Sequence, residues 1–379
     1  MKVSERALNR ALLARQGLST PLTQPVAEVV TAIGAMQAQQ WSTIPIALWS
    51  RMKSFDAADL HAALDAGDLV VGTSIRRTVH LVSAPEHPAY ATVADAMGAN
   101  EWQRGKTAPS KRAAQLRKKL RTHLAKTKTA AQLVDFIEAW VDANPGVIAE
   151  DELTEQRKYK WRPLYTWSAL LRAPADDVWS DKTPAAYRAA KVMPGTKAAP
   201  TVDDALEQVI RAHLRAFGPA APDDVAGWIG WKVTPVRAAM EAMADELETF
   251  SDGTKRTLYD LADAPRPGPD APAPPRLLPA FDSTLLAYAN KHRGRILPDE
   301  YKKAVYSGAN LRVKPTVLVD GQVAGIWSTK LQRRVSTLTI EAFDRIPAKV
   351  QRKLESVGDQ LLRTLEPKSR EYEVVFAQS

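Results

Sequence analysis

Two glutamines separated by one alanine, Gln37 and Gln39, are the residues of this sequence best suited to a specific chemical task. A primary amide is neutral and cannot act as a strong base, so the pair is poorly equipped for a demanding proton abstraction. Its polar groups can instead hold a water molecule, and its carbonyl dipoles can face a developing positive charge. The pair therefore suits a hydrolysis in which the leaving group is already activated.

A helix is expected to carry this pair into place. Pro25 suits the first turn of a helix, and Val26, Val30 and Ile33 follow it as an apolar stripe at helical spacing. The next inward position of the stripe is Gln37, where an unpartnered amide would lose on the order of 1–3 kcal/mol. We therefore expect Gln37 at the C-terminal end of this helix, at the mouth of a site. The pattern alone favours a plainer interpretation, a helix end with surface glutamines.

Length and composition limit the class of protein. The chain has 379 residues and 45% hydrophobic content, which predicts a globular protein of about two to four modules. No apolar run approaches the roughly 20 residues of a membrane span, and the first residues lack the apolar core of a signal peptide. We therefore expect a cytoplasmic protein without a membrane partner.

Cysteine and charge content narrow the chemistry further. The chain has no cysteine, which excludes disulfides, thiolate zinc sites and iron–sulfur clusters. Its six histidines are scattered and it has no phosphate-binding loop, so we expect no metal, no nucleotide and no other cofactor. Lysine plus arginine exceeds aspartate plus glutamate by 52 to 43, a formal charge of +9. This balance favours a polyanionic partner.

A first hairpin is predicted over residues 69–82. Hydrophobic residues there recur at every second position, whereas the segments before it have helical spacing. Helices followed by a two-stranded hairpin make a winged helix. Arg76, Arg77 and His80 would then face nucleic acid. An exposed polar strand face explains the same three residues equally well.

Two later segments are basic. The helix predicted over residues 111–128 has an apolar face of Leu116, Leu120 and Leu124, with Arg117 looking outward. A solvated helix face is the usual meaning of such a run, and contact with a phosphate backbone is the alternative.

Residues 157–162 alternate basic and aromatic side chains. Lys160 and Arg162 suit phosphate contact, and Trp161 suits base stacking. We favour the alternative that Trp161 is buried at the start of an amphipathic helix, predicted over residues 161–171.

The clearest winged-helix pattern covers residues 202–261, with three helices and then a hairpin around an Asp-Gly turn. Residues 264–275 are rich in proline and alanine, which is typical of a linker.

Beyond the linker the chain changes character. A hairpin around Asp320-Gly321, a strand over residues 335–340 and a helix over residues 349–365 predict a small β-rich module. This end of the chain is basic, and we expect Gln322, Arg333 and Arg334 to contact DNA.

The predicted fold is therefore mainly α with β-hairpin wings, of the α+β class. It combines tandem winged-helix motifs with a small C-terminal β-rich module. The expected domains are a first winged helix with the glutamine pair (1–128), a second winged-helix-like module (129–200), a third winged helix (201–263) and the β-rich module (277–379).

The segment Gln37-Ala38-Gln39 resembles the glutamine–apolar–glutamine motif of the AlkZ-type DNA glycosylases, in the winged-helix family that also includes YcaQ. The resemblance covers nearly the whole chain. Its further segments follow the family in order and spacing: residues 77–82, 217–219, 228–231, 278–282 and 297–301. The YcaQ-like branch usually has aspartate at the second polar position, so Gln39 places this chain on the AlkZ side and argues against a general base there.

This resemblance implies a monofunctional enzyme that hydrolyses the N-glycosidic bond of N7-alkylated purines, including bulky or crosslinked adducts. Gln37 and Gln39 would position the water and stabilise the cationic sugar. The substrate would be double-stranded DNA, bound by a monomer in general repair or in resistance to a self-made toxin. N7-alkylated purines are cationic and leave as neutral bases, which matches an uncharged site.

Two rival functions are less consistent with the sequence. Residues 193–197 weakly resemble the hairpin of helix–hairpin–helix glycosylases, but the second glycine of that hairpin is absent. A non-catalytic winged-helix regulator of transcription would fit the repeated wings. It gives no reason, however, for an amide on the apolar stripe at Gln37.

Overall fold

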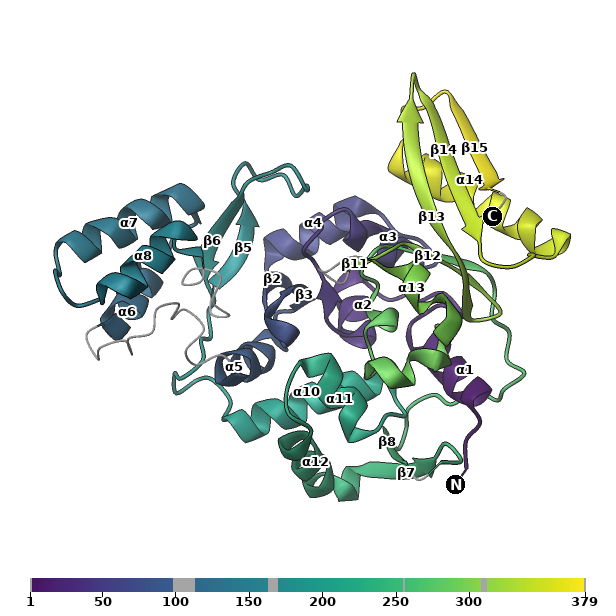
Figure 1. Cartoon of the computed structure of the whole chain (residues 1–379), viewed down its shortest axis with the longest axis horizontal. Helices are drawn as coiled ribbons and strands as arrows, with labels where there is room; N and C mark the ends of the chain where they lie inside the picture. Colours follow the sequence, from purple (N-terminus) through teal and green to yellow (C-terminus); the bar gives the residue numbers. More distant parts are fainter. Residues whose placement is uncertain (1, 98–112, 163–169, 255, 308–311, 378–379) are drawn as a thin grey trace. The chain divides into compact units, whose positions relative to one another are not determined.

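The computed structural model describes residues 2–97, 113–162, 170–254, 256–307 and 312–377 (Figure 1). The chain divides into two compact units: unit 1 comprises residues 1–63 and 210–379, and unit 2 comprises residues 64–209. Helices and strands occur in both units, which confirms the predicted α+β class. The expected first domain, 1–128, is shared between the two units, and the four expected domains stay a prediction.

Unit 1 begins with short amphipathic helices. The side chain of Ser4 accepts a hydrogen bond of 3.2 Å from the backbone of Ala7 and so caps the first helix. The helices in this part of the chain are α1 (Glu5–Arg15), α2 (Val26–Ile33), α3 (Thr43–Trp49) and α4 (Ala57–Ala66), of which α4 runs past the boundary of unit 1.

The elements predicted over residues 202–261 are confirmed. They are α10 (Val202–Phe217), α11 (Pro222–Ile229), α12 (Val233–Ala242), the short 3-10 turn η2 (Ala244–Glu246) and a hairpin of β7 (Leu247–Ser251) and β8 (Thr257–Leu261). Buried aromatic rings join the helices: the ring of Trp228 lies 5.0 Å from that of His213 and 5.7 Å from that of Phe217.

The C-terminal part of unit 1 is a five-stranded sheet covered by a helix. Its strand order is β15-β14-β13-β12-β9, where β15 is Glu371–Ala377, β14 is Val335–Ala342, β13 is Gln322–Gln332, β12 is Thr316–Val319 and β9 is Arg276–Leu278. Trp327, Leu338, Leu354 and Leu361 pack between the sheet and helix α14 (Ala348–Leu365). The predicted hairpin around Asp320, the following strand and the closing helix are confirmed, whereas β9 and the parallel partner β15 were not predicted.

Short elements connect β9 to β12 of this sheet. They are the 3-10 turns η3 (Ser283–Leu285), η4 (Asn290–Arg295) and η5 (Asp299–Tyr301), helix α13 (Lys302–Val305) and the strands β10 (Tyr306–Ser307) and β11 (Arg312–Val313). The linker itself, 264–275, has no helix or strand, as predicted.

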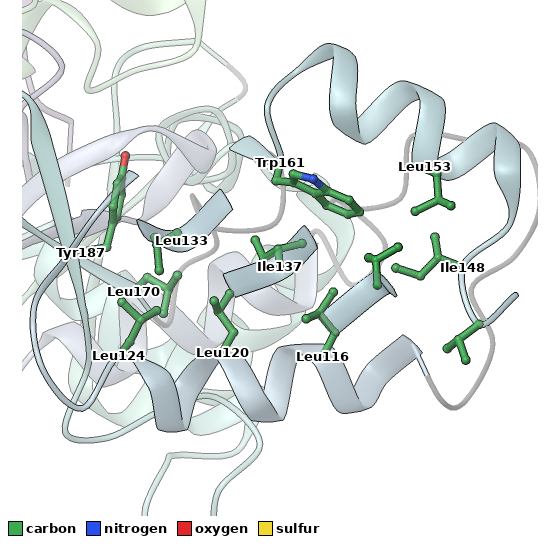
Figure 2. Close-up of a cluster of buried hydrophobic side chains, with 12 residues drawn as sticks. Leu116, Leu120, Leu124, Leu133, Ile137, Ile148, Leu153, Trp161, Leu170 and Tyr187 are labelled. Carbon is green, nitrogen blue, oxygen red and sulfur yellow. The ribbon is translucent and has the colours of Figure 1, made fainter. Parts of the chain in front are cut away.

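Unit 2 contains an antiparallel sheet in the order β3-β2-β5-β6-β4. The strands are β3 (Val79–Ser83), β2 (Leu69–Thr73), β5 (Leu170–Pro174), β6 (Ala185–Ala189) and β4 (Lys128–Thr129). Its helices are α5 (His87–Met97), α6 (Ala113–His123), α7 (Ala130–Asp142) and α8 (Glu150–Lys158). Leu116 and Leu120 of α6, and Leu124 just past its end, point toward Leu133 and Ile137 of α7, which confirms the apolar face predicted for the basic helix (Figure 2).

Three predictions for unit 2 need correction. Residues Ile75–Arg77 form a 3-10 turn, η1, and not part of a strand, because Arg76 and Arg77 take left-handed φ angles of 50° and 55°. The helix expected over residues 161–171 is wrong at its end, where Leu170 begins β5; residues 163–169 lie outside the described part. Arg117 does not look outward, because it pairs with Asp95 at 3.0 Å and is only 20% exposed.

Among the described residues, no helix is both long enough and apolar enough to cross a membrane.

Candidate active site

The segment that carries the two glutamines is a short extended strand. Helix α2 ends at Ile33, and Gly34 follows with a φ of 81°. A side chain at Gly34 would be strained at this φ and would lie 3.2 Å from Ala216 and 3.3 Å from the ring of Phe217, so glycine is favoured here. The chain then forms β1 (Met36–Gln37). The expectation that Gln37 continues the inner stripe of the helix is therefore wrong, because the helix ends one turn earlier.

The two glutamine side chains contact each other. Nε2 of Gln37 donates a hydrogen bond of 2.8 Å to Oε1 of Gln39. Side chains alternate along an extended chain, so residues 37 and 39 share one side while Ala38, 4% exposed, points the other way into the core. Gln37 is half-buried and Gln39 is exposed. The structure thus brings the predicted pair together, with one amide at the surface and one reaching inward.

A small pocket lies beside Gln37. Its volume of about 10 Å³ corresponds to one water molecule. The polar residues Gln16, Thr43, Arg51 and Asp282 line it together with Gln37, and the rest of the segment 279–283 also contributes to its wall. A cavity of this size with several polar partners is suited to hold a single water beside the amide pair.

Histidine 80 cannot serve as an acid near neutral pH. It lies on β3 in unit 2, where burial, and then the nearby charge of Arg76, lower its pKa to about 3. Nδ1 lies 2.9 Å from the carbonyl oxygen of Thr78, and Nη2 of Arg76 lies 3.2 Å from Nε2. A neutral ring that donates through Nδ1 and accepts through Nε2 satisfies both contacts. The side chain is 0% exposed, so the expectation of an outward-facing His80 is wrong.

Comparison with known proteins gives the family of this chain. A sequence model described as "DNA glycosylase AlkZ-like" matches residues 30–364, a stretch that includes both glutamines. The chain belongs to the AlkZ-like DNA glycosylase family. It is therefore a DNA glycosylase, an enzyme that acts on DNA.

Individual relatives support the same assignment. An interstrand DNA cross-link repair glycosylase of Streptomyces sahachiroi is 25% identical over 365 residues, which cover 92% of this chain and 94% of the relative. The solved structure of the Streptomyces sahachiroi DNA glycosylase AlkZ has the same fold, with a TM-score of 0.79, 22% identity and coverage of 99% of this chain and 100% of that one.

The other residues predicted to bind DNA on unit 2 of this AlkZ-like glycosylase differ in exposure. Arg77, Lys160 and Arg162 are exposed and Arg76 is half-buried. Trp161 is fully buried and its indole N–H donates to Glu138 at 2.6 Å. The interpretation of Trp161 as a buried anchor is confirmed, and the base-stacking interpretation is wrong.

The remaining candidates lie at opposite ends of β13 in unit 1. Arg333 and Arg334 form the exposed turn between β13 and β14, with left-handed φ angles of 47° and 71°. Such a two-residue turn favours Asn and Gly, so two arginines here are unusual. Gln322 begins the strand instead, where it is half-buried and donates to the carbonyl of Arg295 at 3.0 Å. The structure therefore does not bring Gln322 to the exposed turn.

One cluster among the described residues has metal-ligand chemistry: Asp223, Asp224 and His292, whose ligand atoms lie within 4.8 Å of one another. Protein groups already bind these side chains. Arg256 lies 3.0 Å from Asp223 and 2.7 Å from Asp224, and Asp223 also contacts His292 at 3.1 Å. The cluster therefore has the character of an ion-pair network.

Sequence reasoning missed the buried polar residues behind the pocket, Gln16, Arg51 and Asp282. Buried charges resemble surface charges in a sequence, and Arg51 and Asp282 are 231 positions apart. The sequence contains one indication of their importance: Asp282 lies in the segment 278–282, which is among the segments that resemble the family.

Proposed function

We propose that this glycosylase removes N7-alkylated purines from double-stranded DNA and that Gln37 and Gln39 carry out the hydrolysis. The contact between the two amides is the observation that carries the proposal. Both amides are neutral at every pH at which the protein is folded. Asp282 lines the pocket, but its oxygens accept hydrogen bonds from Arg51 and from Thr284. The pair therefore offers dipoles beside a cavity that can hold one water, and neither amide can donate a proton to a departing base.

This chemistry selects the substrate. When the bond between the sugar and a neutral base breaks, negative charge develops on the base, which calls for an acid or a strong donor. A purine alkylated at N7 carries a positive charge, so its departure with the bonding electrons yields a neutral base and leaves the positive charge on the sugar. Carbonyl dipoles of Gln37 and Gln39 then stabilise the cationic sugar. A water held by the amides adds to the sugar carbon and releases its proton to solvent.

Bulky adducts and interstrand crosslinks fall within the proposed substrate range. The supporting observation is that the Streptomyces sahachiroi relative is an interstrand DNA cross-link repair glycosylase that aligns with 92% of this chain. Exposure of Gln39 is consistent with a large adduct at the site. The biological role would be base excision repair or self-resistance to an alkylating toxin.

The DNA-binding surface is part of the proposal. We assign backbone contacts to Arg76, Arg77, Lys160, Arg162 and the turn of Arg333 and Arg334, because arginine and lysine neutralise phosphate charge. Strained backbone conformations cluster at functional sites, which gives the left-handed arginine turn additional weight. Action as a monomer, without a nucleotide cofactor and in the cytoplasm, stays a prediction from the sequence.

The decisive experiment compares two lesions in one sequence context. Purified protein is incubated with duplexes that contain either N7-methylguanine or uracil, and abasic sites are scored by heat cleavage. We expect excision of N7-methylguanine and none of uracil. Comparable rates on both would contradict the uncharged mechanism, and no excision of N7-methylguanine would contradict the proposed substrate class.

A further inference from the structure

A fully buried polar network lies behind the glutamine pair, entirely within unit 1. Nη1 and Nη2 of Arg51 each donate a hydrogen bond of 2.9 Å to one carboxylate oxygen of Asp282, and both side chains are 1% exposed. Nη2 of Arg51 also donates to Oε1 of Gln16 at 3.2 Å, and Gln16 is 0% exposed. Burial of a charged pair is costly, and apolar residues often replace such pairs without loss of stability. A contribution to stability therefore does not by itself explain why these three residues are buried together.

The network holds the backbone that precedes Gln37. Nε2 of Gln16 donates to the carbonyl of Ile33, the last residue of α2, at 2.9 Å. The hydroxyl of Ser283, which follows Asp282, donates to the carbonyl of Ala35 at 3.1 Å. Gln16 of the network and Ser283, the residue after Asp282, thus fix two carbonyl groups at the short connection between α2 and β1.

The same network holds the segment that follows Gln39. Arg51 lies two residues past the end of α3, and its Nη1 donates to the carbonyl of Ala47 within that helix at 3.1 Å. At the other end of α3, the hydroxyl of Thr43 donates to the carbonyl of Gln40 at 2.7 Å. Both flanks of the strand with the two glutamines therefore connect to one buried charge pair.

The pocket beside Gln37 also contains a strained backbone conformation that its surroundings must hold. Phe281 lines the pocket with Gln37 and has a φ of 57°, which is rare for a bulky residue. Strain of this kind persists only where the surroundings hold it. The next residue is Asp282, which is held by Arg51 on one side and by the backbone N–H of Thr284, at 3.0 Å, on the other.

We propose that Gln16, Arg51 and Asp282 are positioning residues that fix the orientation of the Gln37 and Gln39 amides. This inference rests on the proposed function, in which those amides act on the water and the sugar. A displacement of about 1 Å in a catalytic group can cost roughly a hundredfold in rate. A network that holds both flanks and lines the pocket restricts such displacements.

A second buried ion pair in unit 1 supplies a matched control. Arg15 lies 2.7 Å from Asp260, with side chains that are 1% and 0% exposed, and this pair joins α1 to β8 without lining the pocket. We compare Asp282→Asn with Asp260→Asn, each of which leaves a buried arginine without its charged partner. Single-turnover excision of N7-methylguanine is measured with enzyme in excess and normalised to the folded fraction. Asp282→Asn should be at least tenfold slower with unchanged DNA affinity, while Asp260→Asn should retain the wild-type rate. Equal rates for the two variants would overturn the proposal.

A third variant covers the case that Asp282→Asn does not fold. Gln16→Met removes the bonds to Ile33 and Arg51 without leaving a charge unpaired, and it should also slow excision at least tenfold. The side-chain amide resonances of Gln37 and Gln39, assigned with the Gln37→Ala and Gln39→Ala variants, give a readout that does not depend on activity. They should shift in Gln16→Met and stay in place in Asp260→Asn. Unshifted resonances would overturn the positioning role, whereas shifted resonances with a wild-type protein that excises no N7-methylguanine would overturn the proposed function alone.

Discussion

Nε2 of Gln37 donates a hydrogen bond of 2.8 Å to Oε1 of Gln39, so each amide restricts the orientation of the other. We expect Gln37→Ala and Gln39→Ala each to lower single-turnover excision by roughly 10²–10³-fold, the loss typical of one electrostatic group at a reaction centre. Because the two amides act as a unit, the double variant should be little slower than the slower single variant. The exposed neighbour Gln40 is the control, and Gln40→Ala should retain the wild-type rate. A wild-type rate in both single variants would refute the assignment.

Acid should destabilise this protein through its buried histidines. Burial lowers the pKa of His80 to about 3 and those of His87 and His213 to about 4. Histidines in the unfolded chain have pKa values near 6.5, so below that pH the unfolded chain binds more protons than the folded chain. The free energy of unfolding therefore falls as the pH drops below about 6.5. Each histidine should cost about 2 kcal/mol of unfolding free energy at pH 5 relative to pH 7.5.

Urea denaturation at several pH values measures this effect. His213→Gln should lower the slope of unfolding free energy against pH between 5 and 6.5 by about one proton. Gln40 is exposed and carries no titratable group, so Gln40→Ala should leave that slope unchanged. If the slope of His213→Gln equals that of the wild type, His213 does not resist protonation in the folded state.

The arginine turn between β13 and β14 should contribute to DNA affinity without contributing to chemistry. Loss of two phosphate contacts in Arg333→Ala/Arg334→Ala should weaken DNA binding and reduce the slope of log affinity against log salt by roughly 1–2. The excision rate at saturating enzyme should stay unchanged. Arg363→Ala is the control, because Arg363 is exposed on α14 and pairs with Asp359 at 2.8 Å. Fluorescence anisotropy at several salt concentrations would decide, and an unchanged slope in the turn variant would remove it from the DNA surface.

Trp161 should matter for stability and not for DNA binding. Its indole ring is fully buried in unit 2 and the indole N–H donates to Glu138 at 2.6 Å, so Trp161→Phe should cost about 1–3 kcal/mol through the lost hydrogen bond and the smaller buried ring. Tyr159 is 49% exposed, and Tyr159→Phe should cost little. Urea denaturation and anisotropy on the same preparations test both readouts. Reduced affinity with intact stability would instead indicate base stacking.

Local patterns in the sequence were sufficient for much of the fold. The hairpin around Asp320 and Gly321 follows from an Asp-Gly turn between apolar runs, and the helices between residues 202 and 242 follow from their periodicity. Strand β15 escaped prediction because it pairs in parallel with β14 through the intervening helix α14, a relationship that no turn signal marks.

The surroundings of the glutamines depend on distant contacts. Helix α2 ends at Ile33, just before Gly34 packs close to Ala216 and Phe217, whereas the helical pattern alone continues the apolar stripe to Gln37. Likewise, nothing near Arg51 in the sequence indicates that its partner is Asp282. The glutamine pair was predictable as a motif, whereas the strand that presents it and the charges that hold it were not.

The order of synthesis has a consequence for helix α1. This helix belongs to unit 1, but its partners are made late: Arg15 pairs with Asp260, 245 positions later, and Arg10 with Asp320, 310 positions later. At ribosomal rates of roughly 5–20 residues per second, α1 waits on the order of 10–50 seconds for Asp260 to be added to the chain. All of unit 2 is synthesised during that interval. During synthesis the apolar face of α1 therefore stays without its native partners until after the whole of unit 2 has been made.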